Sequence, residues 1–485
     1  MKSVLATFAL AVASIVVGSA GCSDDAQKLT VEKLQDPNTC TECHATHTQQ
    51  WSGSMHAYAS DDPVFVAMNA RGQRDTGGKL GDFCVKCHAP MAVRLGLTDG
   101  TSFDPTALPP EARGVTCYFC HAVTDVTDDH NAALALADDQ TMRGGIAKPV
   151  NSPAHFSAGT GLLDSNAPDN QSKLCGACHD LVVPEHLNGV PGGVPLELSY
   201  AEWRATIFAT STTPGAGLTC GGCHMKSSTD VVADAPGLAV PVRENGFHDH
   251  KFPAIDLALT PFPEQAEQAA AVQGDLDPSI GVIGTAPAAS NRPTGGICLT
   301  PNNGDEITVR IDNLGAGHSW PSGASHDRRT WLEVIAYDAS GAVVFSSGIV
   351  PDRVDPEAIA DPNLLAFYDR AKKTDGTPAH FFYDVASTNP QVLKAAITLD
   401  RNDPAFDHSV TKVFSVPGLR GRIDRITTRV LVRPFPFATL QDLVDSGDLD
   451  PAVLDRVPTL SVGGAAKTWT AATQTTDGTH CNRFP

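Results

Sequence analysis

Cys117-Tyr118-Phe119-Cys120-His121 is the stretch that decides the fold, and it is one of five C-x-x-C-H motifs in the chain. This motif is the signature of covalent c-type haem attachment. Residues i and i+3 of a helical turn share one face, so both thiols can add to the two vinyl groups of one porphyrin. The histidine that follows the second cysteine then lies under the iron as its proximal ligand.

Five copies are far more than chance gives. With 13 cysteines and 17 histidines in 485 residues, about 0.01 such motifs are expected at random. Zinc is the alternative, because it also binds C-x-x-C pairs, but it does not require a histidine directly after each pair. Every C-x-x-C pair of this chain has that histidine. We therefore predict five haem c groups, with thioether bonds from Cys40, Cys43, Cys84, Cys87, Cys117, Cys120, Cys175, Cys178, Cys220 and Cys223, and proximal ligands His44, His88, His121, His179 and His224.

The composition is poor for one large protein core. Aromatic residues make up only 6% of the chain, which also contains 42 glycines and 35 prolines. Each haem would add a large apolar plane, and burial of apolar surface stabilises a fold by about 25 cal/mol per Å². We therefore expect the N-terminal region to be a coil-rich wrap with short helices around a haem cluster, in place of a layered core.

The formal net charge is −20 at pH 7. This acidity argues against a nucleic-acid partner, which needs a basic footprint. Solubility is the simpler explanation of the charge, and docking to a basic redox partner is the alternative.

The N-terminus predicts export. Residues 1–21 contain an apolar run, Val4–Val17, that is short for a membrane span and typical of a signal peptide. Cleavage after Ala20 and lipoprotein cleavage before Cys22 both fit, and the polar residues after Cys22 favour a lipidated Cys22. Either route places the protein in the periplasm or at the outer membrane or cell surface. The rest of the chain has no apolar run long enough to span a membrane.

The motifs divide the remainder of the chain. Residues 30–260 form the predicted pentahaem domain, 261–293 a Pro- and Ala-rich connector, and 294–485 an all-β sandwich domain. A helix is expected at 200–209. Alternating apolar residues predict strands at 307–311, 331–337, 343–345, 381–385, 411–416 and 426–432, with a short helix at 441–445.

Three cysteines lie outside the motifs, and the first of them is Cys22. The other two, Cys298 and Cys481, flank the β domain. They could form a disulfide in an oxidising compartment, and two free thiols are the alternative.

Six-coordinate haems need a second axial ligand, and twelve histidines lie outside the motifs. His56 and His155 each have an aromatic neighbour that could stack on a porphyrin, and His250 is favoured over His248. His318 begins a Gly-rich turn in the β domain, where it either donates a ligand or shapes the turn. The distal candidates are His56, His155, His250, His186, His130, His47 and His318.

Further stretches carry a resemblance to a known family. They are Trp51-x-x-Ser54-x-His56, Gly114-Val115-Thr116 before the third motif, Asp180 after the fourth, Met225 after the fifth, and His250-Lys251-Phe252. With them, residues 38–260 resemble the exported multihaem cytochromes c that include tetrahaem electron carriers and hydroxylamine-oxidoreductase-like proteins. The resemblance implies stacked haems and electron transfer, and the loop 317–323 is similar to one in the β domain that often follows such haem domains. Pentahaem nitrite reductases replace one motif histidine by lysine, whereas all five motifs here end in histidine.

Three functions compete at this stage. The first is an electron carrier or conduit between redox partner proteins, with no catalytic residues and all irons six-coordinate. The second is a redox enzyme that acts on a small nitrogen or sulfur species at one open haem, with His130, Arg143 and Lys148 as candidate acid or base groups. The third is self-assembly through the β domain, marked by a distal histidine donated between subunits.

Overall fold

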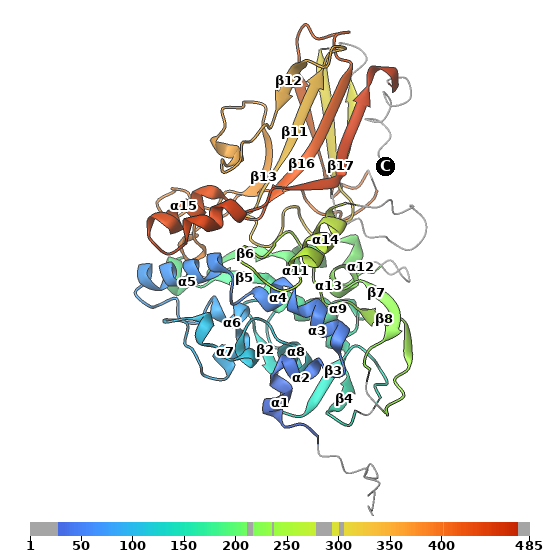
Figure 1. Cartoon of the computed structure of the whole chain (residues 1–485). Coiled ribbons are helices and arrows are strands. Elements are labelled where there is room, and N and C mark those ends of the chain that lie inside the picture. Colours follow the sequence, from blue (N-terminus) through green and yellow to red (C-terminus); the bar gives the residue numbers. More distant parts are fainter. Residues whose placement is uncertain are drawn as a thin grey trace, which may run out of the picture.

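The structure is a computed structural model of the chain, and it describes residues 28–150, 152–210, 217–234, 237–277, 305–400 and 402–473, with the backbone alone at 293–299. A lower part holds the five motifs on short helices and two-stranded sheets, and a strand-rich part lies above it (Figure 1). Within those ranges, no helix has both the length and the apolar character of a membrane span. The predicted signal peptide, Cys22 and Cys481 lie outside the described residues, and of Cys298 only the backbone is described.

Each motif lies on or next to a short helix, as predicted. The hydroxyls of Thr116 and Thr219 accept backbone N–H groups of Phe119 and Gly222, at 3.4 and 2.8 Å. Such caps satisfy the free N–H groups of a helix start, so these two helices begin at the first cysteine of the motif. The helices of the lower part are α1 (Val31–Gln35), α2 (Pro37–Cys40), α3 (Ala45–Ser52), α4 (Met55–Tyr58), α5 (Pro63–Asp75), α6 (Val85–His88), α7 (Pro90–Arg94), η1 (Pro105–Ala107), η2 (Pro110–Ala112), α8 (Cys117–His121), η3 (Gly161–Leu163), α9 (Pro168–His179), α10 (Glu185–Asn188), α11 (Ser199–Arg204), α12 (Ile207–Thr210) and α13 (Cys220–His224).

The lower part also contains strand pairs that the sequence analysis did not predict. Three of them are antiparallel, and the pair β3–β4 is parallel. Strands β1, β5 and β7 begin within three residues of a motif histidine, so each carries the chain away from an iron position. The pairs are β1 (Val123–Val126) with β2 (Leu134–Leu136), β3 (Thr141–Gly144) with β4 (Phe156–Gly159), β5 (Asp180–Val183) with β6 (Val194–Leu198), and β7 (Ser227–Val231) with β8 (Val242–His248).

The upper part is a sandwich of two antiparallel sheets. One sheet has the order β15-β10-β9, and the other has the order β14-β13-β11-β16-β17, with β12 also paired to β11. In β10, Ile307, Val309 and Ile311 point into the core, which is the period-two burial of a strand with one covered face. The elements are β9 (Pro293–Leu299), β10 (Glu306–Asn313), β11 (Arg329–Tyr337), β12 (Val343–Ser347), η4 (Pro356–Ala358), β13 (Leu365–Asp369), η5 (Phe382–Asp384), β14 (Pro390–Gln391), β15 (Ser409–Ser415), β16 (Arg425–Arg433), α15 (Phe437–Asp445), η6 (Pro451–Arg456), β17 (Leu460–Thr470) and η7 (Ala471–Thr473).

The apolar cores differ in size between the two parts. The sandwich core joins 22 buried residues from both sheets. Around the third and second motifs, by contrast, two separate clusters hold five buried residues each. The predicted fold class, a helical multihaem region followed by an antiparallel β region, is therefore confirmed, with the strand pairs as an addition to the expected coil.

Two predicted elements are wrong. The predicted strand at 381–385 is the single turn η5, because Phe381 and Tyr383 are buried against α5 and α15 without a neighbouring strand to pair with. The predicted helix at 200–209 is divided into α11 and α12. At the break, the Thr206 hydroxyl donates to the Trp203 carbonyl at 2.8 Å, which competes with the helical backbone bonds.

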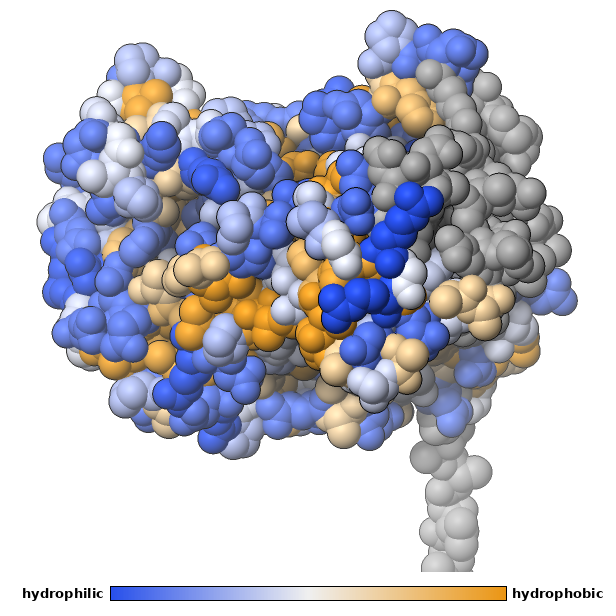
Figure 2. Space-filling model, turned by 90° about the horizontal axis from the view of Figure 1, so that it is seen from above, coloured by the Kyte–Doolittle hydropathy of each residue, from blue (hydrophilic) through white to orange (hydrophobic). Residues whose placement is uncertain are grey.

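The two parts are packed together over a continuous junction. Helix α14 (Gln265–Leu276), within the predicted connector, places Val272 and Leu276 in the sandwich core. In the other direction, α15 packs its Leu440 and Leu443 against Val64 of α5. Figure 2 views the sandwich end from above and shows a mainly hydrophilic face with apolar residues gathered near its middle. The β region therefore adjoins the motif region closely enough to contribute residues to it.

Candidate haem-binding site

None of the ten motif cysteines is in a disulfide, and several lie beside a cysteine of another motif. The neighbouring pairs are Cys40 and Cys117, Cys87 and Cys178, and Cys175 and Cys220. Cys120 of the third motif is also within electrostatic reach of Cys175 and Cys178. The motifs therefore follow one another in space as first, third and fourth, with the second and the fifth both beside the fourth.

Four motif histidines face a second histidine from elsewhere in the chain. An imidazole nitrogen lies about 1.1 Å from its ring centre and about 2.0 Å from a bound metal, so two imidazoles on one metal ion have centres about 6.2 Å apart. The observed separations fit one iron between each pair. The ring centres are 6.4 Å apart for His44 and His155, 6.2 Å for His179 and His56, 6.4 Å for His121 and His250, and 6.4 Å for His224 and His318.

Backbone carbonyls fix the orientation of most of these rings. A carbonyl can only accept, so the facing Nδ1 carries the proton and Nε2 is left unprotonated for a metal. Among the distal histidines, His155, His250 and His318 donate to carbonyls at 3.0, 3.0 and 2.9 Å. The same arrangement holds for the motif histidines His44, His88, His121 and His224, with carbonyl distances of 2.7, 3.1, 2.5 and 2.9 Å.

Burial favours the neutral form of His56, His179 and His318, which is the form that binds iron. Desolvation, followed by the neighbouring His179 and His224, lowers the pKa of His56 to about 3. Desolvation likewise lowers the pKa values of His179 and His318 to about 4. These imidazoles therefore do not need to lose a proton at neutral pH before they coordinate a metal.

The structure separates His250 from His248. His248 uses both ring nitrogens, since Nδ1 donates to the Met225 carbonyl at 2.9 Å and Nε2 contacts Ser165 Oγ at 3.2 Å. His250 has only its Nδ1 engaged in this way and faces His121. The preference for His250 as the ligand therefore has a geometric basis.

Three candidates do not lie opposite a motif histidine. The ring of His47 stacks on Phe247 at 4.3 Å and meets the ring of His250 edge-on at 4.7 Å. His47 therefore packs against the candidate ligand His250. Its ring centre is 6.2 Å from that of His44, but the two residues are three positions apart at the start of α3, and the ring of His44 already faces that of His155. His186 lies on α10, and none of the ring pairs among the described residues joins it to a motif.

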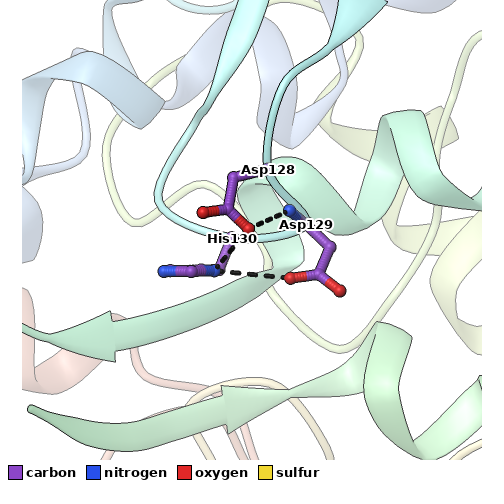
Figure 3. A group of neighbouring side chains, drawn as sticks. All are labelled: Asp128, Asp129 and His130. Atoms are coloured by element: carbon purple, nitrogen blue, oxygen red, sulfur yellow. Dashed lines mark hydrogen bonds and ion pairs between the residues drawn. The ribbon is translucent and has the colours of Figure 1, made fainter. Parts of the chain in front are cut away.

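His130 lies in a loop between β1 and β2. Its Nδ1 is 3.3 Å from Asp128 and 3.4 Å from Asp129, and the three side chains point toward one another (Figure 3). These carboxylates are the partners of His130. The sequence signal for a ligand at this position was only the residue type, which does not distinguish a loop ion pair from an axial ligand.

The second motif differs from the other four. The ring of Phe65 stacks in parallel on His88 with centres 4.0 Å apart. Across the described ranges, no histidine ring faces His88 as His155 faces His44. The charged group within electrostatic reach of His88 is Asp256, which is held by Arg328 of the β region through bonds of 2.7 and 2.9 Å. The sequence analysis missed both Phe65 and this ion pair, because each joins residues far apart in the chain.

The comparisons with known proteins agree with this arrangement. Residues 39–122 match the family of cytochrome c554 and c-prime. The chain contains a multihaem c-type cytochrome domain. The chain also has the fold of a penta-heme cytochrome c552 from Thermochromatium tepidum, with a TM-score of 0.56, 20% identity, and coverage of 91% of this chain and 99% of that one. No curated protein matches the chain in sequence.

The thiols and imidazoles fit haem c, so roles can be assigned to the chain's own residues. Haem bound at these positions supplies one-electron chemistry. The motif cysteines would attach the haem, and the paired histidines would hold its iron, with their rings oriented by the backbone carbonyls. Such a domain transfers electrons, and c-type cytochromes are typically exported.

Proposed function

We propose that the chain is a five-haem electron carrier of the bacterial cell envelope, which passes electrons between redox partner proteins. The observation that supports this most strongly is the set of four imidazole pairs with ring centres 6.2 to 6.4 Å apart. A ligand on both sides of an iron leaves no position for a substrate and favours electron transfer. Cysteines of different motifs lie next to one another, so neighbouring haems would be close enough for electrons to pass between them.

The four distal histidines all come from the same chain as the motifs that they face. His318 comes from the β region and faces His224, with the two ring planes within 7° of parallel. A histidine donated by a second copy is therefore not needed at these four sites. In this proposal, the β region covers one side of the haem-binding region and supplies His318 to it. None of these four pairs requires a histidine from a second copy of the chain.

The experiment counts haems and their spin states in the exported holoprotein. Intact-mass measurement is expected to give the mature chain plus five haem c groups, and the double variant Cys220→Ala/Cys223→Ala is expected to give four. A chain that folds with all ten thiols free would refute the proposal. The same mass separates the two processing routes, because lipid on Cys22 adds to it and cleavage after Ala20 does not.

A second function is favoured by the second motif. The described part of the chain supplies no imidazole opposite His88, so that iron would keep one coordination position for a small ligand. The residues that could assist a reaction there are Asp256 and Arg328. They replace His130 and Arg143 as candidates, since each of these two is paired with a nearby aspartate.

This candidate is tested with ligands and oxidants. Cyanide and nitric oxide are expected to bind one equivalent per protein if the position is open. Reoxidation of the reduced protein by nitrite, hydroxylamine or sulfite, with turnover, would make it an enzyme. Binding without turnover would leave the electron carrier as the function.

A further inference from the structure

The first motif has the most exposed attachment site of the five. Its two inner residues, Thr41 and Glu42, are both exposed, as are Ala45 and Thr46 directly after its histidine. In the other four motifs at least one inner residue is fully covered: Val85, Tyr118, Phe119, Gly176, Ala177 and Gly221 are buried. The first motif also stands at one end of the spatial order, since its thiol contact is to the third motif through Cys40 and Cys117. Electrons can therefore enter or leave the row most directly here.

An exposed aromatic side chain adjoins the same site. His155, which faces His44, is followed directly by Phe156, whose side chain is 54% exposed. Phe156 lines a hollow of 430 Å³ together with Val31 and Glu32 of α1. Figure 1 shows α1, β3 and β4 together at the end of the molecule away from the sandwich. The hollow is lined by polar and acidic side chains besides Val31 and Phe156, and an exposed aromatic within a polar rim is the kind of surface that forms a protein interface.

Carboxylates lie around this surface, and Lys28 places one positive charge over the Phe156 ring, 4.8 Å from its centre. The carboxylates of Glu42 and Asp234 lie close enough to Cys43 to interact with it electrostatically, and so does the carboxylate of Asp36 with Cys40. The backbone N–H of Asp234 donates to the Cys43 carbonyl at 2.8 Å, which holds Asp234 beside the motif. Within the described ranges, Glu32, Asp36, Glu42 and Asp234 have no ion-pair partner. Four unpaired carboxylates around a redox site attract a partner of positive charge.

We propose that this end is the docking surface for a small basic one-electron carrier protein, whose lysines meet Glu32, Asp36, Glu42 and Asp234 around an apolar contact on Phe156. The inference rests on the proposed electron-transfer function and adds the site and the chemistry of the partner. One electron crosses between the carrier's metal and the iron held by His44, so one is oxidised as the other is reduced. Solubility alone would not require the charges to gather around the most exposed motif.

The test compares two double charge reversals in the holoprotein. Glu42→Lys/Asp234→Lys changes the proposed surface, and Asp352→Lys/Asp424→Lys changes the net charge equally on the sandwich, where both aspartates are exposed. The probe is a lysine-rich mitochondrial-type cytochrome c, and stopped-flow spectroscopy measures its second-order rate of electron exchange at low and high salt. A neutral ferrocene derivative measures exchange that needs no docking.

The first double variant is expected to slow exchange with the lysine-rich probe by about tenfold or more at low salt and to weaken the salt dependence. The sandwich variant and the ferrocene rates are expected to change little. Equal slowing in both variants, or none in the first, would overturn the docking surface. If the unaltered protein exchanges no electrons even with the ferrocene, the proposed function itself fails, which separates the two outcomes.

Discussion

Replacement of His318 by alanine is the sharpest test of the site. His318 comes from the β region, and its ring centre lies 6.4 Å from that of His224. The substitution removes one imidazole and leaves the loop in place. The Asn313 amide donates to the His318 carbonyl at 2.8 Å, and the Ser319 N–H donates to Glu202 at 3.1 Å, and both bonds remain when the side chain is cut back.

The expected size of the effect follows from the number of imidazole pairs. Among the residues that the structure describes, four motif histidines face a second histidine and His88 does not. With five haems, the unaltered protein should contain low-spin and high-spin irons in a ratio of 4:1. In His318→Ala the ratio should become 3:2, because the iron on His224 loses a strong-field ligand.

Electron paramagnetic resonance with integration of both spin states measures this ratio. Cyanide titration gives an independent count, which should rise from one equivalent to two. His130→Ala is the control, since His130 is paired with Asp128 and Asp129 and should leave the ratio at 4:1. An unchanged ratio in His318→Ala, or a ratio of 5:0 in the unaltered protein, would refute the assignment of the pairs.

Three further predictions concern stability. Burial raises the pKa of Glu197 from 4.5 to about 7, so the folded state binds this proton more tightly than the unfolded state does. The free energy of unfolding should therefore fall by about 3 kcal/mol between pH 4.5 and pH 7. Glu197→Gln should remove this fall in denaturant titrations at several pH values, and an unchanged pH profile would count against the prediction. Arg328→Met leaves Asp256 without its partner and should lower the free energy of unfolding by about 2 kcal/mol, read as a lower melting temperature than that of the unaltered protein. Leu440→Ala, in the junction between α15 and α5, should cost about 2–5 kcal/mol, whereas Val343→Ala at a 58% exposed position should cost under about 0.5 kcal/mol in the same assay.

The parts of the site that could be predicted are those in which the chemistry acts over a few residues. A porphyrin with two vinyl groups requires two thiols one helical turn apart and a histidine beside the second, so the motif is readable without a fold. Alternation in β10 and in the first half of β16 was readable for the same reason, since one covered face imposes a period of two, whereas β11 is buried on both faces. The predicted strand at 381–385 failed because alternation reports burial and not the presence of a pairing partner.

The assignment of distal ligands could not be predicted, because it depends on distance in space. His155 faces His44 and His318 faces His224, across separations in sequence that no spacing rule connects. His56 had an aromatic neighbour in the sequence and His130 had only its residue type, but neither signal indicates which motif a histidine faces, and His56 faces His179 while His130 pairs with aspartates in a loop. The difference of the second motif was also unreadable, since five identical motifs give no indication that one of them has a phenylalanine beside its histidine.

One loop of the β region explains why the sandwich and the motif region form one unit. His318 faces His224 at the start of the loop, and Arg328 holds Asp256 near His88 at its end. Between them, Ser319 and Ser322 bind Glu202 of α11 at 3.1 and 2.8 Å. A domain that was only an attachment would need none of these contacts at two different motifs. The imidazole that faces His224 and the charge near His88 therefore both depend on how the β region is packed, which makes the sandwich part of the proposed electron-transfer site.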